Sequence, residues 1–314
     1  METEILTPKQ IDQAAAWIKK GELVAFPTET VYGLGASIFN EEAMAKIFVA
    51  KGRPRDNPLI AHVASLEAVS QIAVDLPETF YLLARRFFPG PLTLVVLRHP
   101  KVPALASADL PTIALRQPSH PVAQEFIKAA GVPLVAPSAN LSGNPSGTTA
   151  CHVLEDLRGK IAAIIDAGPC SIGIESTVLD LVSFERPTIL RPGQITKEQI
   201  EGVLGQEVVY YSKGRRASPG MRYRHYAPQA IVKLFFEEEK LRAYLESAFP
   251  CRRLVLSQDK IEGPFLHLPL SAQTLYASLR KGDEERCEEL LLLCSKAILA
   301  DVGLMNRITK MAEG

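Results

Sequence analysis

The sequence predicts an α/β fold with two domains, and three observations support this prediction. Short apolar segments typical of strands alternate with segments of helical periodicity, and Gly or Pro separates many of them. The chain has 314 residues, which is long for one compact core, and its apolar share of 47% is sufficient for two. The alternation stops near residue 208 and resumes near residue 230. We therefore predict domains at 1–207 and 230–314, joined by a linker at 208–229.

The first domain begins with a capped helix. Thr7 fits the N-cap position, Pro8 fits the first helical position, Gln10 completes a capping box and Gly21 ends the segment. A second helix is expected at 41–51 and a third near 120–130. Apolar runs bounded by turn residues predict the strands of this domain, at 22–27, 58–63, 92–98, 112–116, 132–137, 161–166 and 176–182.

A second, smaller alternation forms the last part of the chain. Strands are expected at 230–236 and 253–257. Helices are expected at 237–248, 272–280 and 284–299. These segments together are close to the minimum size of a domain with its own core.

The composition excludes several classes of protein. With 35 basic and 35 acidic residues the net charge is zero, so the chain as a whole does not attract nucleic acid or anionic membranes. The five cysteines form no CxxC pair, which predicts reduced thiols and no structural zinc site. The N-terminus lacks the features of a secretory signal, and the apolar stretch 290–303 contains Lys296 and Asp301. We expect a cytoplasmic protein without a membrane span or a protein-built metal site.

The segment KGRPRDNPLIAHV at 51–63 offers cations at a regular spacing. Lys51, Arg53, Arg55 and Asn57 would share one face if this segment were extended, and the prolines favour extended backbone. Arginine forks match phosphate oxygens, so such a ribbon would suit a polyphosphate. The alternative is that Lys51 only caps the preceding helix and that the arginines are solvated. Local pattern alone favours the second interpretation.

Two further segments are rich in hydroxyl and amide groups. FPTETVYGLG at 26–35 places threonines and a glutamate after a predicted strand, where they would bind a small polar substrate or simply form a turn. APSANLSGNPSGTT at 136–149 is long for a connection in a compact domain, although its composition alone indicates a loop. The chain has no Walker A loop, GxGxxG fingerprint or GxSxG elbow.

Taken in order, these segments and three others resemble one known family. The six motifs are FPTETVYGLG, KGRPRDNPLIAHV, PTIALR, APSANLSGNPSG, ESTVLD and ILRPG. Together they closely resemble the YrdC-type threonylcarbamoyl-AMP synthases. SPGMRYRHYAP at 218–228 and GLMNRITKMA at 303–312 resemble the linker and the C-terminal end of the long, two-domain members. The resemblance implies a YrdC-like twisted mixed sheet with helices around a basic cavity, followed by a smaller Rossmann-like α/β domain.

The resemblance also implies a reaction. L-threonine, bicarbonate or CO2, and ATP would give threonylcarbamoyl-AMP and pyrophosphate, so the chain would be a nucleotidyltransferase. A partner transferase would use the product to form N6-threonylcarbamoyladenosine (t6A) at position 37 of tRNAs that read ANN codons. Mg2+ would accompany the ATP phosphates. Positioning and charge neutralisation suffice for this chemistry, so no protein nucleophile is expected.

Roles of individual residues follow from the same resemblance. The implied contacts to L-threonine are Thr30, His62, Arg116, Ser176 and the backbone at Ala136, with Arg116 facing the carboxylate. The implied contacts to ATP are Arg53, Asn57, Thr112, Ser138, Ser146, Arg191 and, in a linker that closes as a lid, Tyr226. Lys51 and Arg53 are implied to stabilise charge in the reaction.

Two competing functions remain open at this point. The related fold has been linked to double-stranded RNA, and a local basic surface could contact tRNA, although the chain shows no aromatic–basic RNA-binding signature. The other is an O-carbamoyltransferase like the hydrogenase maturation factors, which contain a related domain. Those proteins also carry an acylphosphatase-like segment and paired CxxC motifs, and neither is visible in this sequence.

Overall fold

A computed structural model describes residues 2–211, 228–247, 249 and 251–312. The chain divides into two compact units, one built from residues 1–142 and 147–222 and the other from residues 143–146 and 223–314. No helix in the described ranges is long and apolar enough to cross a membrane.

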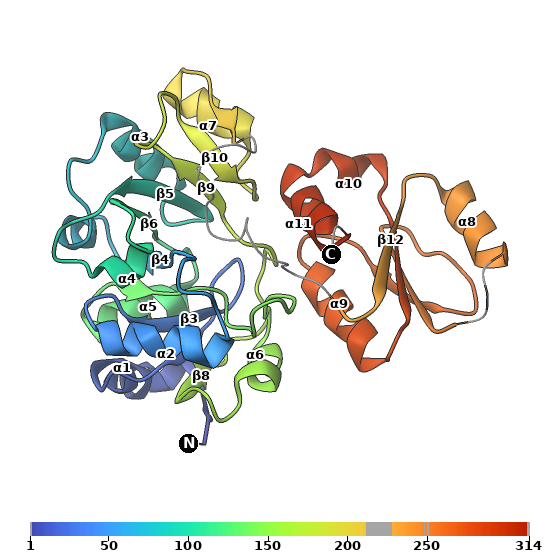
Figure 1. Ribbon diagram of the computed structural model, residues 1–314, viewed down its shortest axis with the longest axis horizontal. Helices are drawn as coiled ribbons and strands as arrows, with labels where there is room; N and C mark the ends of the chain where they lie inside the picture. The colour runs from blue at the N-terminus through green and yellow to red at the C-terminus, as the bar shows by residue number, and fades with distance from the viewer. Residues whose placement is uncertain (1, 212–227, 248, 250, 313–314) are drawn as a thin grey trace. The chain divides into compact units, whose positions relative to one another are not determined.

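The first unit is built on a mixed sheet of eleven strands (Figure 1). In spatial order these are β1 (Glu4–Leu6), β8 (Ala163–Ile165), β2 (Val24–Phe26), β3 (Gly33–Ser37), β7 (Leu134–Val135), β4 (Ile60–His62), β6 (Thr112–Arg116), β5 (Leu92–Leu97), β9 (Thr177–Asp180), β10 (Thr188–Arg191) and β11 (Val209–Tyr210). Parallel and antiparallel pairs alternate irregularly along it; β4 and β6 are parallel, whereas β5 runs antiparallel to β6.

Helices flank this sheet. They are η1 (Pro8–Gln10), α1 (Ile11–Lys19), α2 (Glu41–Lys51), η2 (Glu67–Gln71), α3 (Glu78–Phe87), α4 (Ala104–Ser107), α5 (Pro121–Ala130), α6 (Ala150–Leu157) and α7 (Lys197–Leu204). Local chemistry sets the bounds of α2. The side chain of Asn40 accepts a hydrogen bond from the backbone N–H of Ala43 at its start. Gly52 adopts the left-handed conformation, which ends α2 after Lys51.

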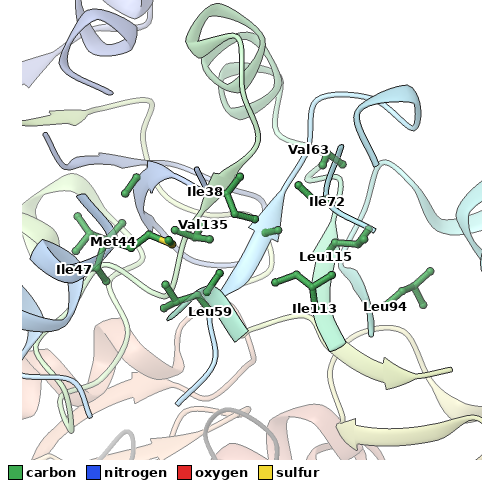
Figure 2. Close-up of a cluster of buried hydrophobic side chains, with 14 of the residues drawn as sticks. Ile38, Met44, Ile47, Leu59, Val63, Ile72, Leu94, Ile113, Leu115 and Val135 are labelled. Carbon is green, nitrogen blue, oxygen red and sulfur yellow. The ribbon is translucent and has the colours of Figure 1, made fainter. Parts of the chain in front are cut away.

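Both faces of the sheet are buried, as the alternating side chains of β2 and of the residue before it illustrate. Val24 and Phe26 belong to a core that α1 and α5 cover, whereas Leu23 and Ala25 belong to the larger core on the other face. Figure 2 shows part of the larger core, where Met44 from α2 lies with side chains from several strands. Each such aliphatic side chain contributes roughly 1.5–3 kcal/mol through burial, so the sheet holds its strand ends in fixed positions.

The second unit has a parallel sheet of four strands (Figure 1). In spatial order these are β12 (Ile231–Phe235), β15 (Glu289–Leu293), β13 (Arg253–Ser257) and β14 (Leu266–Pro269). Its helices are α8 (Glu238–Ser247), α9 (Leu275–Glu284), α10 (Lys296–Ala300) and α11 (Val302–Ala312). A large mixed sheet and a smaller parallel one confirm the predicted fold class.

The predicted helix at 284–299 is wrong. Residues 289–293 form the inner strand β15, which pairs with β12 on one side and β13 on the other. A strand buried on both faces is apolar along most of its length, as residues 290–293 are here, so its sequence lacks the alternation of a surface strand. A short apolar run of this kind does not distinguish a buried strand from a helix.

The start of β15 carries a buried charge cluster. Glu289 is 9% exposed and accepts hydrogen bonds from Lys233 at 2.6 Å, Tyr244 at 2.6 Å and Arg253 at 2.7 Å. Burial raises the pKa of the Glu289 carboxyl, but these donors outweigh burial and lower it to about 2. The pKa is below that of the unfolded chain, so this stabilisation is present above about pH 4.5 and is lost as the pH falls towards 2.

We expect Glu289→Gln to lower the free energy of unfolding by about 2–3 kcal/mol at pH 7, because two cations would lose their counter-charge. The deficit relative to wild type should shrink between pH 4.5 and pH 2, where the native carboxylate itself is protonated. Urea unfolding at several pH values, together with hydrogen exchange of the β15 amides, measures the deficit and its dependence on pH. Glu285→Gln is the control, since its ion pairs are more exposed, and an equal deficit there would contradict the prediction.

Candidate functional site

Three of the predicted threonine contacts lie at one edge of the large sheet. His62 and Arg116 end the parallel strands β4 and β6 and are paired in register. β5 runs antiparallel to β6, and β9 runs parallel to β5, so β9 begins at the same edge where β6 ends. Ser176 directly precedes β9. Residues that are far apart in the sequence thus reach one edge, because the mixture of parallel and antiparallel pairs brings the ends of β4 and β6 and the start of β9 to the same side of the sheet.

Arg116 lies at the centre of this edge. Its NH1 donates to Oγ1 of Thr30 at 2.9 Å, and its NH2 lies 2.7 Å from Oε1 of Glu29. The Arg116 and Glu29 side chains are 4% and 6% exposed. Nevertheless, neither carboxylate oxygen of Glu29 forms an aligned hydrogen bond with a described residue. The same holds for Nε and Nη2 of Arg116. Buried polar groups are normally satisfied, so these atoms indicate a place for a polar ligand.

A hydroxyl pair extends the same edge. Oγ of Ser176 lies 2.7 Å from Oγ1 of Thr93, at the start of β5. Arg191, which ends β10, donates from NH2 to Oγ of Ser176 at 3.2 Å and from Nε to the Ser176 carbonyl at 3.1 Å. All three side chains are buried. Arg191 was expected among the ATP contacts, and the structure places it against Ser176.

His62 is neutral in this setting. Burial, assisted by the positive charge of Arg116, lowers the pKa of His62 to about 3, and the contact with the Ile60 carbonyl opposes the shift only in part. Nδ1 of His62 lies 3.1 Å from that carbonyl oxygen, so this nitrogen carries the proton and Nε2 is left as an acceptor. A neutral imidazole offers a hydrogen-bond partner without adding a second cation beside Arg116.

Lys51 is bound to the loop that follows β7. Its Nζ donates to the carbonyls of Ser138 and Asn140, both at 2.5 Å, and its own carbonyl accepts from the N–H of Ser142 at 2.8 Å. Burial and the charge of Arg53 lower the pKa of Lys51 well below its usual value. The side chain therefore fastens residues 138–142, which include the predicted ATP contact Ser138.

The extended ribbon, the first of the two interpretations of residues 51–57, does not form. Lys51 is the last residue of α2 and residues 55–57 form a turn, so the alternate side chains do not share one face. The helix continues to Lys51 because the left-handed Gly52 ends it only there. Arg53 instead donates from NH2 to the carbonyl of Pro58 at 3.0 Å. Asn57 is buried nearby, just before β4.

The other predicted site residues are distributed over several parts of the chain. Thr112 begins β6, at the end where β4 also begins and away from Arg116. The N–H of Ala136 donates to the Ile60 carbonyl at 2.9 Å, which holds the chain after β7 against β4. Ser146 is buried, but the segment 143–146 groups with the second unit. Tyr226 lies outside the described residues.

The structure brings together part of each predicted set of contacts. The threonine group comprises the predicted threonine contacts Thr30, His62, Arg116 and Ser176, and Arg191, a predicted ATP contact, adjoins it through Ser176. The nucleotide group comprises the predicted ATP contacts Arg53, Asn57, Thr112 and Ser138 together with Lys51, which binds the Ser138 carbonyl. Glu29 and Thr93 also lie in the threonine group. Glu29 was expected only as part of the segment 26–35, as a substrate contact or a turn residue, and Thr93 was not expected. Glu29 stands in the motif TET at 28–30, but nothing in the sequence indicates that it would meet Arg116.

Two family models match the chain. The Sua5_yciO_yrdC model, described as "Telomere recombination", matches residues 16–193, and "Threonylcarbamoyl-AMP synthase, C-terminal domain" matches residues 195–313. The chain belongs to the Sua5/YrdC family. Two curated members are the threonylcarbamoyl-AMP synthases of Pyrococcus abyssi and Bacillus subtilis. The first is 48% identical, over 74% of this chain and 70% of its own length. The second is 42% identical, over 97% and 93%.

Solved structures of the Sua5/YrdC family have the same fold. P. abyssi Sua5 complexed with L-threonine is 39% identical, with a TM-score of 0.90 over 99% of this chain and 98% of that one. E. coli YciO is 24% identical with a TM-score of 0.55, over 62% of this chain, and shares the fold alone. Full-length HypF, at 21% identity, also shows only the fold, and the match covers 29% of its length.

Proposed function

We propose that this chain is an L-threonylcarbamoyladenylate synthase, which joins L-threonine, bicarbonate or CO2, and ATP into threonylcarbamoyl-AMP and pyrophosphate. The observation that carries the proposal is the meeting of Arg116 and Thr30, a buried cation and a buried hydroxyl, at the sheet edge where His62 also lies. These are the complements of an amino acid's carboxylate and side-chain hydroxyl. Support comes from relatives named threonylcarbamoyl-AMP synthase and from the relative solved with L-threonine.

The chemistry requires positioning more than covalent catalysis. The amine of L-threonine takes up CO2 to form a carbamate, and a carbamate oxygen attacks the α-phosphate of ATP while pyrophosphate leaves. Arg116 binds the carboxylate in this proposal, and His62, Ser176 and the backbone at Ala136 complete the amino acid site. Arg53, Asn57, Thr112, Ser138, Ser146 and Arg191 contact ATP, and the charges of Lys51 and Arg53 offset the charge that develops on the phosphates.

The contacts of Lys51 add a second role to its proposed charge. Because its ammonium binds the carbonyls of Ser138 and Asn140, it orders the loop that meets the nucleotide. Mg2+ is proposed to enter with ATP, since the nucleotide group offers cations, amides and hydroxyls but no carboxylate cage. The metal would neutralise phosphate charge.

The wider setting is also part of the proposal. Residues 1–207 form the catalytic domain, 208–229 a lid carrying Tyr226, and 230–314 the small C-terminal domain. The product passes to the t6A transferase machinery, with a weak tRNA contact at most. The five cysteines are free thiols, which suits reaction in the reducing cytoplasm.

Pyrophosphate release tests this function. We expect the purified chain to release pyrophosphate from ATP only when L-threonine and bicarbonate are both present, because the α-phosphate is attacked by a carbamate that needs both. A coupled pyrophosphate assay, with each substrate omitted in turn, measures this requirement. Equal turnover without an amino acid would refute the proposal, and stable tRNA binding without turnover would favour the RNA-binding alternative.

A further inference from the structure

Glu29 is a buried carboxylate that none of the roles above employs. It follows β2, and its backbone carbonyl accepts a hydrogen bond from the N–H of Ile172 at 2.8 Å, so its place in the chain is held firmly. Its side chain is 6% exposed and lies 2.7 Å from NH2 of Arg116. Neither carboxylate oxygen makes an aligned hydrogen bond with any residue in the described ranges.

This ion pair is poorly compensated. Burying two charges costs several kcal/mol per ion, and their attraction repays this only when further hydrogen bonds satisfy both groups. Thr30 supplies one such bond to NH1 of Arg116. The remaining donors of Arg116 and both oxygens of Glu29 lack them among the described residues. Arg116 and Glu29 would therefore readily give up their contact with each other for ligand groups that carry the same charges and satisfy them better.

A zwitterion carries such partners. If the carboxylate of an α-amino acid binds Arg116, it takes the place that Glu29 holds, and the freed Glu29 lies within reach of the ammonium on the adjacent carbon. One internal pair is replaced by two external pairs with no change in net charge. A ligand with a carboxylate alone would displace Glu29 without compensating it, which leaves a buried charge unpaired.

We propose that Glu29 recognises the ammonium group of the substrate by this ion-pair exchange, and thereby selects α-amino acids over hydroxy acids. The inference rests on the proposed function, because it takes L-threonine as the ligand. It makes Glu29 a specificity-determining residue for the binding step. Glu29 also masks Arg116 from simple carboxylates in the empty protein.

The test uses Glu29→Gln with two ligands, L-threonine and 3-hydroxybutyrate of matching configuration, which lacks only the amino group. Isothermal titration calorimetry should show that E29Q binds L-threonine about 10-fold to 100-fold more weakly, because a charge-assisted bond is lost. The same variant should bind 3-hydroxybutyrate several-fold more tightly, because Arg116 no longer has an internal competitor. The two ligands respond in opposite directions.

Other outcomes would overturn the inference. If E29Q binds both ligands equally more weakly, Glu29 only orients Arg116. An unchanged affinity for L-threonine would mean that Glu29 does not contact the ammonium. Glu78→Gln, an exposed residue of α3, is the matched control and should affect neither ligand. If E29Q does not fold, Glu29→Asp keeps the charge and should weaken the binding of L-threonine but not that of 3-hydroxybutyrate. A wild-type chain that binds no L-threonine would refute the proposed function itself.

Discussion

Replacing Arg116 by alanine is expected to weaken L-threonine binding by about 100-fold to 1000-fold and to change ATP affinity by no more than a few-fold. The lost contact is a buried, charge-assisted one, and the substrate carboxylate would remain desolvated without a cation; together these cost roughly 3–4 kcal/mol. ATP is spared because none of the proposed ATP contacts is a hydrogen-bond or ion-pair partner of Arg116 among the described residues, and Thr112 lies at the other end of β6. Titration calorimetry with L-threonine and with a non-hydrolysable ATP analogue measures the two affinities separately.

The variant needs a control for folding. Removing Arg116 leaves the Glu29 carboxylate buried without its cation, which is itself destabilising. The double variant Arg116→Ala/Glu29→Gln removes both charges and should regain much of the lost thermal stability while still binding L-threonine weakly. Equal losses for L-threonine and ATP in the double variant would count against the assignment of Arg116 to the amino acid.

Gly193→Ala is expected to lower the free energy of unfolding by about 3 kcal/mol, because the site has no room for a methyl group. A Cβ at Gly193 would lie 2.5 Å from the nitrogen of Thr177 and 2.7 Å from the carbonyl oxygen of Glu175. Both are backbone atoms, one at the start of β9 and the other two residues before it, so the chain must shift. For a chain of this size the melting temperature should fall by roughly 4–5 °C in differential scanning calorimetry.

The same substitution should also weaken the binding of L-threonine, since the shift separates Arg191 from Ser176. Gly202→Ala provides the matched control. Gly202 lies inside α7, and no described atom beyond the helix's own backbone lies within 4 Å of the position that an added methyl group would take. Alanine there should stabilise the protein by about 0.5–1 kcal/mol through its higher helix propensity. A Gly193→Ala variant as stable as wild type would contradict the packing argument.

Short elements were predictable where local chemistry is decisive. The helix at 41–51 and the strands at 112–116 and 253–257 were predicted with the bounds that the structure gives. Their caps, prolines and apolar runs act over a few residues, so the sequence alone contains the information. Strand β3 was missed because its sequence, GLGAS, contains two glycines and no alternation. It forms because β2 and β7 pair with it on either side.

The sequence by itself determined the fold class, the family and the set of chemical groups available to the site. The order of the motifs was sufficient for this, because several long motifs in a fixed order are far more specific than any one of them. The tertiary structure decided how those groups are combined. It showed that Lys51, predicted as the last residue of the helix at 41–51, binds the loop at Ser138, and it placed Glu29 against Arg116. Contacts between residues 87 positions apart, as between Arg116 and Glu29 or Lys51 and Ser138, depend on strand order and register, which no local pattern encodes.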